Sequence, residues 1–374
     1  MRKNVLIAGA SLGWGHLQAA RNIEKAISHI DPTWCIESID VLDFLPRGVG
    51  LISQNAWRLA SCYLDNIYSR LYRKSVNHTR AGAISQRLAR STAIRIANEL
   101  ARPPDIYIAT HSFAASIGFH LKELVKCRLC VVATDFVLHQ MHFSPHVDLY
   151  YVPPAYECKL SLGDVNRYEA RILDTGIPID NDFAVEKDSC ELRKRFGLSQ
   201  GLATVLVSFG GSGLRAESHI QLFSYLLSLN LPLQFLVLAG RNARFAKAMR
   251  RLYGCGNRYG NLIKIYDFVE PVSDFYAVAD IFIGKAGGLS ISEALAVGLP
   301  IIIIDLLPGQ EESNLRMLVS NGLGSYVSTT SELEQRFESL LNKITTFGGK
   351  KHLHEFARPL SSQTIATSIT GLAV

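Results

Sequence analysis

The chain has 374 residues, of which 48% are hydrophobic, and it carries a formal net charge of +6 at pH 7. This length favours two domains, and the hydrophobic content excludes a mainly disordered chain. No apolar run approaches the roughly 18 residues that a transmembrane helix needs, and the short apolar stretch 5–8 indicates a first β-strand rather than a signal peptide. Seven scattered cysteines favour a reducing compartment.

Strands and helices alternate along the first half of the chain. Short apolar runs predict strands, and apolar residues spaced by three and four predict helices. The predicted elements are strands 5–8, 36–42, 106–110, 129–133, 149–152 and 172–175, with helices 17–30, 51–72, 81–101 and 112–126. Their order is typical of an α/β domain with a parallel sheet.

The second half repeats this alternation and predicts a second parallel-sheet domain. Its predicted strands are 203–209, 233–239, 262–266, 281–284 and 301–304, and residues 331–345 are predicted to be helical. We place the domains at residues 1–180 and 181–354. The loops after parallel strands lie at the carboxyl edge of a sheet, where ligands bind in such folds.

A basic and aromatic segment spans residues 47–95. Residues 47–100, which include this segment, contain nine basic and two acidic side chains, interleaved with one tryptophan and three tyrosines. The basic residues are Arg47, Arg58, Arg70, Arg73, Lys74, Arg80, Arg87, Arg90 and Arg95. No nucleic-acid-binding motif accompanies them, so the segment predicts an anionic membrane surface as partner rather than nucleic acid. The alternative is an ordinary solvated helix face.

A glycine-containing loop, residues 9–16, joins the first strand to the first helix and ends in Gly15 and His16. The dipole of a helix N-terminus disfavours the protonated form of a histidine there. A neutral imidazole can accept a proton from a hydroxyl group. His16 is therefore a candidate catalytic base, and the alternative is a residue that only caps or orders the loop.

Asp135 and His139 follow the strand at 129–133. Asp135 can act as the base itself or orient His16, and His139 can bind an acceptor. A zinc site formed by Asp135, His139, His142 and His146 is a competing interpretation, which Pro145 and the absence of a helical histidine pair disfavour. We predict no metal.

Three loops of the second half have the properties of an anion site. Gly211 and Ser212 follow the first strand, and Arg241 follows the second. Gly287 and Gly288 open a helix whose free N–H groups can hold a phosphate. Glu293 in that helix can accept hydrogen bonds from a ribose, and the polar loop with Gln310, Glu311 and Asn314 can hold sugar hydroxyls.

These motifs resemble GT-B glycosyltransferases, most closely the group of monogalactosyldiacylglycerol synthase and the processive diacylglycerol glucosyltransferases, and more distantly the GlcNAc transferase that makes lipid II. The motifs that carry the resemblance occur in the same order as in the family. They are Gly13-Trp14-Gly15-His16, Thr134-Asp135-Phe136-Val137-Leu138-His139, Gly176-Ile177-Pro178-Ile179, and the segment from Lys285 to Asn314. The family usually has tryptophan where this chain has His142, which bears on the acceptor.

The resemblance implies two Rossmann-like domains facing a central cleft, an acceptor- and membrane-binding first domain and a donor-binding second one. The final helix often crosses back in this fold, and residues 355–374 are the candidate. His16 and Asp135 would be catalytic, and Gly15 and His139 would bind the acceptor. The donor-binding residues would be Gly211, Ser212, Arg241, Phe268, Val269, Gly287, Gly288, Leu289, Glu293, Gln310, Glu311 and Asn314.

The implied reaction is inverting transfer of galactose or glucose from a UDP-sugar to diacylglycerol, with no cofactor. The protein would be cytoplasmic and associated peripherally with the inner face of the membrane. Alternatives are transfer to a polyprenyl-linked or secondary-metabolite acceptor, possibly of GlcNAc, a UDP-sugar epimerase of the same fold, and a non-catalytic sugar-nucleotide sensor or membrane adaptor.

Overall fold

The computed structural model of the protein describes residues 2–46, 79–138, 142–144, 146–158, 171–213, 220–228, 231–254, 257–258, 261–307, 311–345 and 350–372. The predicted helix at 51–72 lies outside these residues, as do His139, Gln310 and most of the basic and aromatic segment. Among the helices whose course is described, none combines the length and the hydropathy that a membrane crossing requires.

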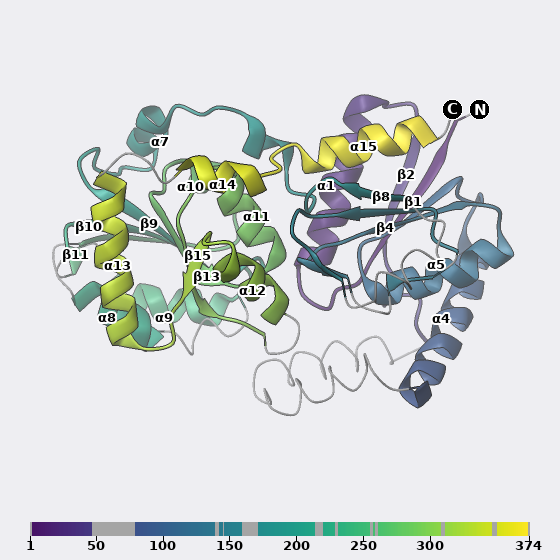
Figure 1. Ribbon diagram of the computed structural model, residues 1–374, viewed down its shortest axis with the longest axis horizontal. Coiled ribbons are helices and arrows are strands. Elements are labelled where there is room, and N and C mark those ends of the chain that lie inside the picture. Colours follow the sequence, from purple (N-terminus) through teal and green to yellow (C-terminus); the bar gives the residue numbers. More distant parts are fainter. Residues whose placement is uncertain are drawn as a thin grey trace. The chain divides into compact units, whose positions relative to one another are not determined.

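The chain divides into two compact units. The first comprises Met1–Asn181, Leu307–Asn314 and Leu360–Val374, and the second comprises Asp182–Leu306 and Leu315–Pro359. The chain therefore enters the second unit twice, at Asp182 and at Leu315, and returns to the first unit twice. One return is the polar loop with Glu311 and Asn314, and the other is the C-terminal helix (Figure 1).

The first unit is built on a parallel sheet that has six strands within the described residues. In spatial order these are β2 (Cys35–Asp40), β1 (Asn4–Gly9), β3 (Ile106–Ala109), β4 (Arg128–Val132), β6 (Leu149–Val152) and β8 (Arg171–Asp174). A small separate sheet pairs β5 (Val137–Leu138) with β7 (Glu157–Cys158). The inner strands are continuous apolar runs because helices cover both faces of the sheet.

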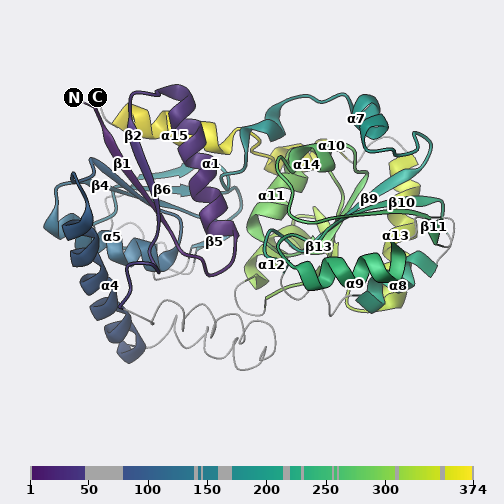
Figure 2. The same ribbon diagram turned by 180° about the vertical axis from the view of Figure 1, so that it is seen from behind.

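Within the described ranges, two helices cover each face of this sheet. On one face α1 (Gly15–Ile30) packs with α15 (Ser361–Leu372), and on the other α4 (Thr79–Glu99) packs with α5 (Ser112–Leu124). Figures 1 and 2 both show the C-terminal helix alongside α1. Side-chain hydroxyls fix the start of α15, because Ser362 donates to the Ile179 carbonyl at 2.6 Å and Ser361 accepts from the Ile179 N–H at 3.1 Å.

The second unit has a sheet of seven described strands. Their order is β11 (Asn257–Arg258), β12 (Asn261–Tyr266), β10 (Leu233–Leu238), β9 (Ala203–Ser208), β13 (Ile281–Lys285), β14 (Ile301–Asp305) and β15 (Gly324–Tyr326). All pairs are parallel except β11 with β12 at the edge. The predicted α/β architecture with two mainly parallel sheets is confirmed.

The helices of the second unit are mostly short. Those on one face, which share a core with the sheet, are α8 (Ile220–Ser228), α9 (Ala243–Tyr253) and α13 (Thr330–Thr345). The remaining helices are the 3-10 helix η2 (Asn181–Ala184), α7 (Ser189–Arg195), α10 (Ser273–Ala277), α11 (Gly288–Ala296), α12 (Glu312–Ser320) and α14 (Lys350–Phe356). Helix α12 begins in the returning loop, so the division between the units falls within it.

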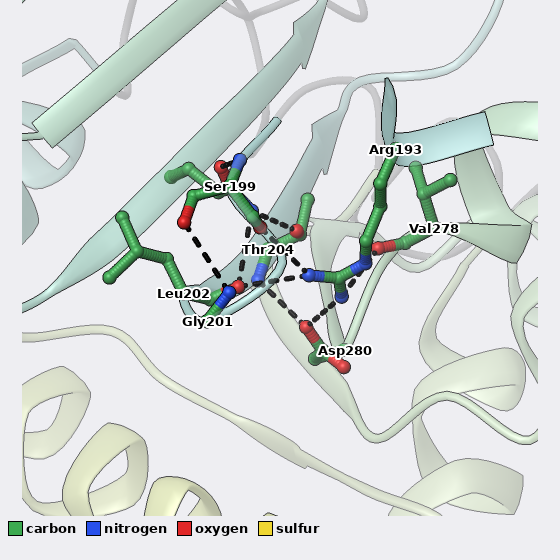
Figure 3. A network of polar contacts seen from close by, with 8 residues as sticks. Arg193, Ser199, Gly201, Leu202, Thr204, Val278 and Asp280 are labelled. Carbon is green, nitrogen blue, oxygen red and sulfur yellow. Dashed lines mark hydrogen bonds and ion pairs between the residues drawn. The ribbon is translucent and has the colours of Figure 1, made fainter. Parts of the chain in front are cut away.

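A polar network holds the amino ends of the strands in the second unit (Figure 3). The buried Arg193 guanidinium donates to the carboxylate of Asp280 at 2.7 Å and to the carbonyl of Val278 at 3.1 Å. Asp280 also accepts from the N–H of Thr204 at 2.8 Å. This network joins α7 to the starts of β9 and β13, at the sheet edge opposite the predicted ligand loops, and its role is structural.

Candidate functional site

The first candidate site lies where β1, β3 and β4 end. Because these strands are parallel neighbours, the residues that follow them meet at one edge of the sheet. Gly13 has φ +95°, a conformation that favours glycine, and it turns the chain from β1 into α1. His16 lies in the first turn of α1 and is only 8% exposed. The fold therefore presents His16 at the carboxyl edge, as the sequence predicted.

Two threonines hold the imidazole of His16. Its Nδ1 lies 2.9 Å from the carbonyl oxygen of Thr110 and 2.8 Å from the hydroxyl of Thr134. A carbonyl oxygen can only accept, so Nδ1 must carry the hydrogen. The hydrogen of the neutral ring is then on Nδ1, and Nε2 presents its lone pair. Such a nitrogen can accept a proton from an alcohol.

A second imidazole lies beside the first. The ring of His111 meets that of His16 edge to face, with centroids 4.6 Å apart. His111 directly follows β3 and caps α5, because its Nδ1 accepts a hydrogen bond from the N–H of Phe113 at 3.0 Å. The sequence analysis missed this residue. The available signal was a histidine between a predicted strand and a predicted helix, in the same kind of loop as His16.

Asp135 is held by an asparagine from the distant returning loop. The side-chain amide of Asn314 donates to Asp135 Oδ1 at 2.7 Å, and its oxygen accepts from the N–H of Phe136 at 2.7 Å. Asn314 is fully buried, whereas Asp135 is partly exposed. All three residues belong to the first unit. The structure thus brings Asn314, predicted as a donor contact, to the predicted catalytic carboxylate.

Glu311 belongs to the same returning loop and shapes it. Its carboxylate accepts from the N–H of Leu307 at 2.9 Å, and its own N–H donates to the Leu307 carbonyl at 2.9 Å. The side chain is 3% exposed. This reciprocal pair closes the loop directly before α12, and a role of Glu311 in sugar binding stays a prediction.

In the second unit, two glycine loops pack tightly on each other. Gly210, Gly213 and Gly240 all have φ between +60° and +74°, and the N–H of Arg241 donates to the Gly211 carbonyl at 2.9 Å. A Cβ placed on Gly240 would lie 2.6 Å from the Gly210 carbonyl oxygen. Glycine is therefore required for this approach, which sets the backbone around Gly211 and Ser212.

Arg241 lies over an aromatic ring at the same sheet edge. Its guanidinium carbon is 4.3 Å from the ring centroid of Phe268, a cation–π contact that restricts the arginine. Phe268 follows β12, and Val269 comes next in the chain, with both side chains half-buried. Two residues predicted from separate loops, Arg241 and Phe268, are thus brought together.

The N-terminus of α11 provides the third element. Gly287 is its N-cap, with no side-chain cap, so Gly288 and Leu289 in the first turn present backbone N–H groups. Helix N-termini of this kind bind phosphate. One turn further, Glu293 interacts with the buried hydroxyl of Tyr276. Burial, and then the Glu293 carboxylate, raise the pKa of Tyr276 well above its usual value.

The residues proposed for zinc fall partly outside the described chain. Across the described ranges, no group of three or more histidine, cysteine, aspartate or glutamate side chains is arranged to hold a metal ion. Of the four residues of the zinc interpretation, Asp135, His142 and His146 are described, and His139 lies outside these ranges.

A comparison with solved structures identifies the fold class of the protein. Among solved structures, MurG of Acinetobacter baumannii superposes with a TM-score of 0.64 and 17% sequence identity, over 99% of this chain and all of the other. This likeness establishes the GT-B fold of glycosyltransferases.

The sequence comparisons find similar glycosyltransferases for both halves of the chain. A model described as monogalactosyldiacylglycerol (MGDG) synthase matches residues 16–179, and a model described as the glycosyltransferase family 28 C-terminal domain matches residues 205–362. Two relatives named processive diacylglycerol beta-glucosyltransferase, from Bacillus licheniformis and Bacillus subtilis, are 24% and 25% identical, covering 98% of this chain and 94% of each relative. The chain is a glycosyltransferase, and its first half is similar to monogalactosyldiacylglycerol synthase.

Proposed function

We propose that this glycosyltransferase moves a hexose, glucose or galactose, from a UDP-sugar to diacylglycerol and forms a β-glycosyl lipid. The observation that carries the proposal is the likeness to diacylglycerol glucosyltransferases over nearly the full length of both chains. Because the likeness spans both units, it includes the acceptor half as well as the donor half. The acceptor half is where an enzyme acting on a lipid would differ from other GT-B transferases.

His16 is the proposed base. The hydrogen on Nδ1, held by Thr110, leaves Nε2 to take the proton of the acceptor hydroxyl. The acceptor oxygen attacks the anomeric carbon as the bond to UDP breaks, and this single displacement inverts the configuration. Asp135 adds a carboxylate next to Thr134, whose hydroxyl contacts His16. Its negative charge would favour the imidazolium that forms.

The second unit supplies the donor site in this proposal. Backbone N–H groups at Gly211, Ser212 and the start of α11 face a diphosphate, and Arg241 adds a positive charge. Held in place before the reaction, these groups stabilise the charge that develops on UDP as it leaves. The helix dipole and the arginine replace a metal ion in this role, and no cofactor takes part.

The remaining donor contacts follow from the same placement. Phe268 and Val269 would hold the uracil, and Glu293 the ribose. Gln310 and Glu311 would bind hydroxyls of the sugar. Asn314 was predicted as a further donor contact. Its amide already serves Asp135 and Phe136, so we assign it mainly to positioning the carboxylate.

The acceptor side requires contact with a bilayer, since diacylglycerol stays there. Gly15 and His139 are the proposed acceptor-binding residues. The basic and aromatic segment, residues 47–95, is the proposed contact with an anionic membrane surface. The enzyme would then work peripherally on the inner face of the membrane.

The proposal is tested with the purified full chain, vesicles that contain diacylglycerol, and UDP-glucose, UDP-galactose and UDP-GlcNAc supplied separately. Mass spectrometry of the lipid fraction identifies the product. We expect a hexosyl diacylglycerol with at least one of the first two donors. Consumption of the donor without any glycolipid, or conversion of one UDP-sugar into another, would refute the proposed acceptor.

A further inference from the structure

The neighbouring histidines His16 and His111 carry opposite tautomers. Nδ1 of His111 accepts a hydrogen bond from the N–H of Phe113 at 3.0 Å, so this nitrogen has no hydrogen. The hydrogen of the neutral His111 ring must be on Nε2. In His16 the carbonyl of Thr110 requires the hydrogen on Nδ1. One ring therefore presents a donor at Nε2, and the other presents an acceptor.

The position of His111 favours its neutral state. Protonation would place a hydrogen on Nδ1 and remove the capping bond to Phe113, and the N-terminus of α5 disfavours a positive charge. In His16, by contrast, Nδ1 already carries a hydrogen toward the Thr110 carbonyl, so protonation at Nε2 leaves this bond in place. Of the two rings, His16 is thus suited to take up a proton, and His111 is suited to remain a neutral hydrogen-bond donor.

The two rings also share a location. They follow β1 and β3, which are adjacent in the sheet, and their centroids are 4.6 Å apart. A molecule whose hydroxyl reached Nε2 of His16 would therefore lie beside the His111 ring. In diacylglycerol the free hydroxyl is on a carbon next to one that bears an ester, so an ester carbonyl lies close to the reacting oxygen.

We propose that His111 is an acceptor-binding residue, whose Nε2–H donates a hydrogen bond to the ester oxygen beside the reacting hydroxyl. This inference rests on the proposed function. It assigns a ligand class, an alcohol flanked by an ester, to the pair of imidazoles. The competing interpretation is that His111 only caps α5.

His111→Asn separates these two roles. Asparagine is among the best N-cap residues, because its side-chain oxygen can accept the bond from Phe113, but it has no donor at the position of Nε2. His111→Ala loses both functions. His120→Asn is the matched control, since His120 lies on the same helix and contacts Gln86 at the surface. Each variant is assayed for thermal unfolding, UDP affinity, and kcat and KM for the lipid.

The decisive comparison pairs the enzyme variants with two acceptors, a diacylglycerol and the dialkylglycerol that has ether oxygens in place of esters. We expect the parent to have a KM roughly 10-fold lower for the ester, the scale of one hydrogen bond. His111→Asn should unfold like the parent and bind UDP equally well, yet show the same raised KM for both lipids. His120→Asn should behave like the parent.

The outcomes separate the two proposals. If His111→Asn retains the parental preference for the ester, His111 is a capping residue only and this inference fails. If His111→Asn unfolds early, the acceptor comparison still decides, because KM is compared between lipids in the same variant. If the parent transfers sugar to neither lipid, the proposed function fails and this inference fails with it.

Discussion

Asn314 donates a hydrogen bond to the Asp135 carboxylate at 2.7 Å across a separation of 179 residues. With its second contact, to the N–H of Phe136, it ties the returning loop to the end of β4. The C-terminal half of the chain thereby positions a carboxylate of the proposed acceptor half. Of these two contacts, the one to Asp135 involves a charged group, and the one to Phe136 involves a neutral backbone N–H.

Asn314→Ala should destabilise the first unit. The substitution leaves the buried N–H of Phe136 without its acceptor, which costs about 1–3 kcal/mol. Thermal unfolding followed by circular dichroism measures the loss. The matched control is Asn321→Ala, since Asn321 donates local bonds to the Met317 carbonyl and Ser320 at the end of α12. If the two variants unfold at the same temperature, the Asn314 contacts contribute nothing.

Thr134→Val should slow transfer without changing donor affinity. Valine has nearly the shape of threonine but lacks the hydroxyl that lies 2.8 Å from Nδ1 of His16. We expect kcat to fall by roughly tenfold, the scale of one hydrogen bond, with an unchanged dissociation constant for UDP. Thr134→Ser should restore the rate. The control Thr92→Val removes a buried hydroxyl that bonds within α4, and it should leave kcat unaltered.

Gly240→Ala should abolish tight UDP binding. The added Cβ would lie 2.6 Å from the Gly210 carbonyl oxygen, so the loop with Gly211 and Ser212 must move. We expect UDP to bind at least roughly tenfold more weakly in titration calorimetry, the factor that corresponds to about 1.4 kcal/mol. Gly322→Ala is the control for backbone strain alone, because Gly322 has φ +67° but a Cβ added there would meet no atom within 4 Å beyond its chain neighbours. Equal UDP affinities in the two variants would contradict the assignment.

Asp274 should make the second unit sensitive to acid. Burial opposes its ionisation, but hydrogen bonds from Lys187 and Arg195 hold the pKa of this carboxyl below its ordinary value of 3.8. A lowered folded-state pKa contributes stability that is present above pH 3.8 and is lost as the pH falls below it. Urea unfolding from pH 5 down to about pH 2.5 should show this loss in the parent and a smaller one in Asp274→Asn.

The control for this pH dependence is Asp267→Asn. Asp267 forms an exposed ion pair with Arg250, and such pairs contribute little to stability. This variant should follow the parent curve at every pH. A parent whose stability stays constant through the acid range would show that the Asp274 pairs are not linked to folding.

Neutralising Arg70, Arg73 and Lys74 together should weaken binding to anionic vesicles, and added salt should weaken the parent in the same way. These residues lie outside the described ranges, so this prediction depends on the sequence. The control neutralises Arg244, Lys247 and Arg251, which are exposed on α9 in the second unit. Co-sedimentation that is insensitive to salt, or equal losses in the two triple variants, would argue against the proposed segment.

The sequence predicted the sheet strands well because strands covered on both faces are continuous apolar runs. The strand β6 matches its predicted range of 149–152, and β10 and β14 differ from theirs by a single residue at one end. The same reasoning placed His16 and Asp135 at the carboxyl edge of a sheet, since both come after predicted parallel strands. β15 was missed because its three residues, Gly324–Tyr326, include no apolar run.

Other features depend on contacts that local patterns do not encode. The pairing of Asn314 with Asp135 requires that the loop Leu307–Asn314 leaves the second unit, and nothing in its composition indicates this path. His111 was overlooked because a single histidine before a helix is usually a cap. Its significance appeared only with the position of the His16 ring.

The proposed base lies in the first unit and the proposed donor site in the second, and His16→Ala tests this division most directly. Transfer to diacylglycerol and UDP affinity are measured on the same preparation. We expect the rate to fall by at least roughly a hundredfold, the usual scale for an acid–base group, while UDP binds as in the parent. His16→Asn, whose amide can still donate to Thr110, guards against a folding defect and should be equally slow. Parental turnover in a folded His16 variant would contradict the account.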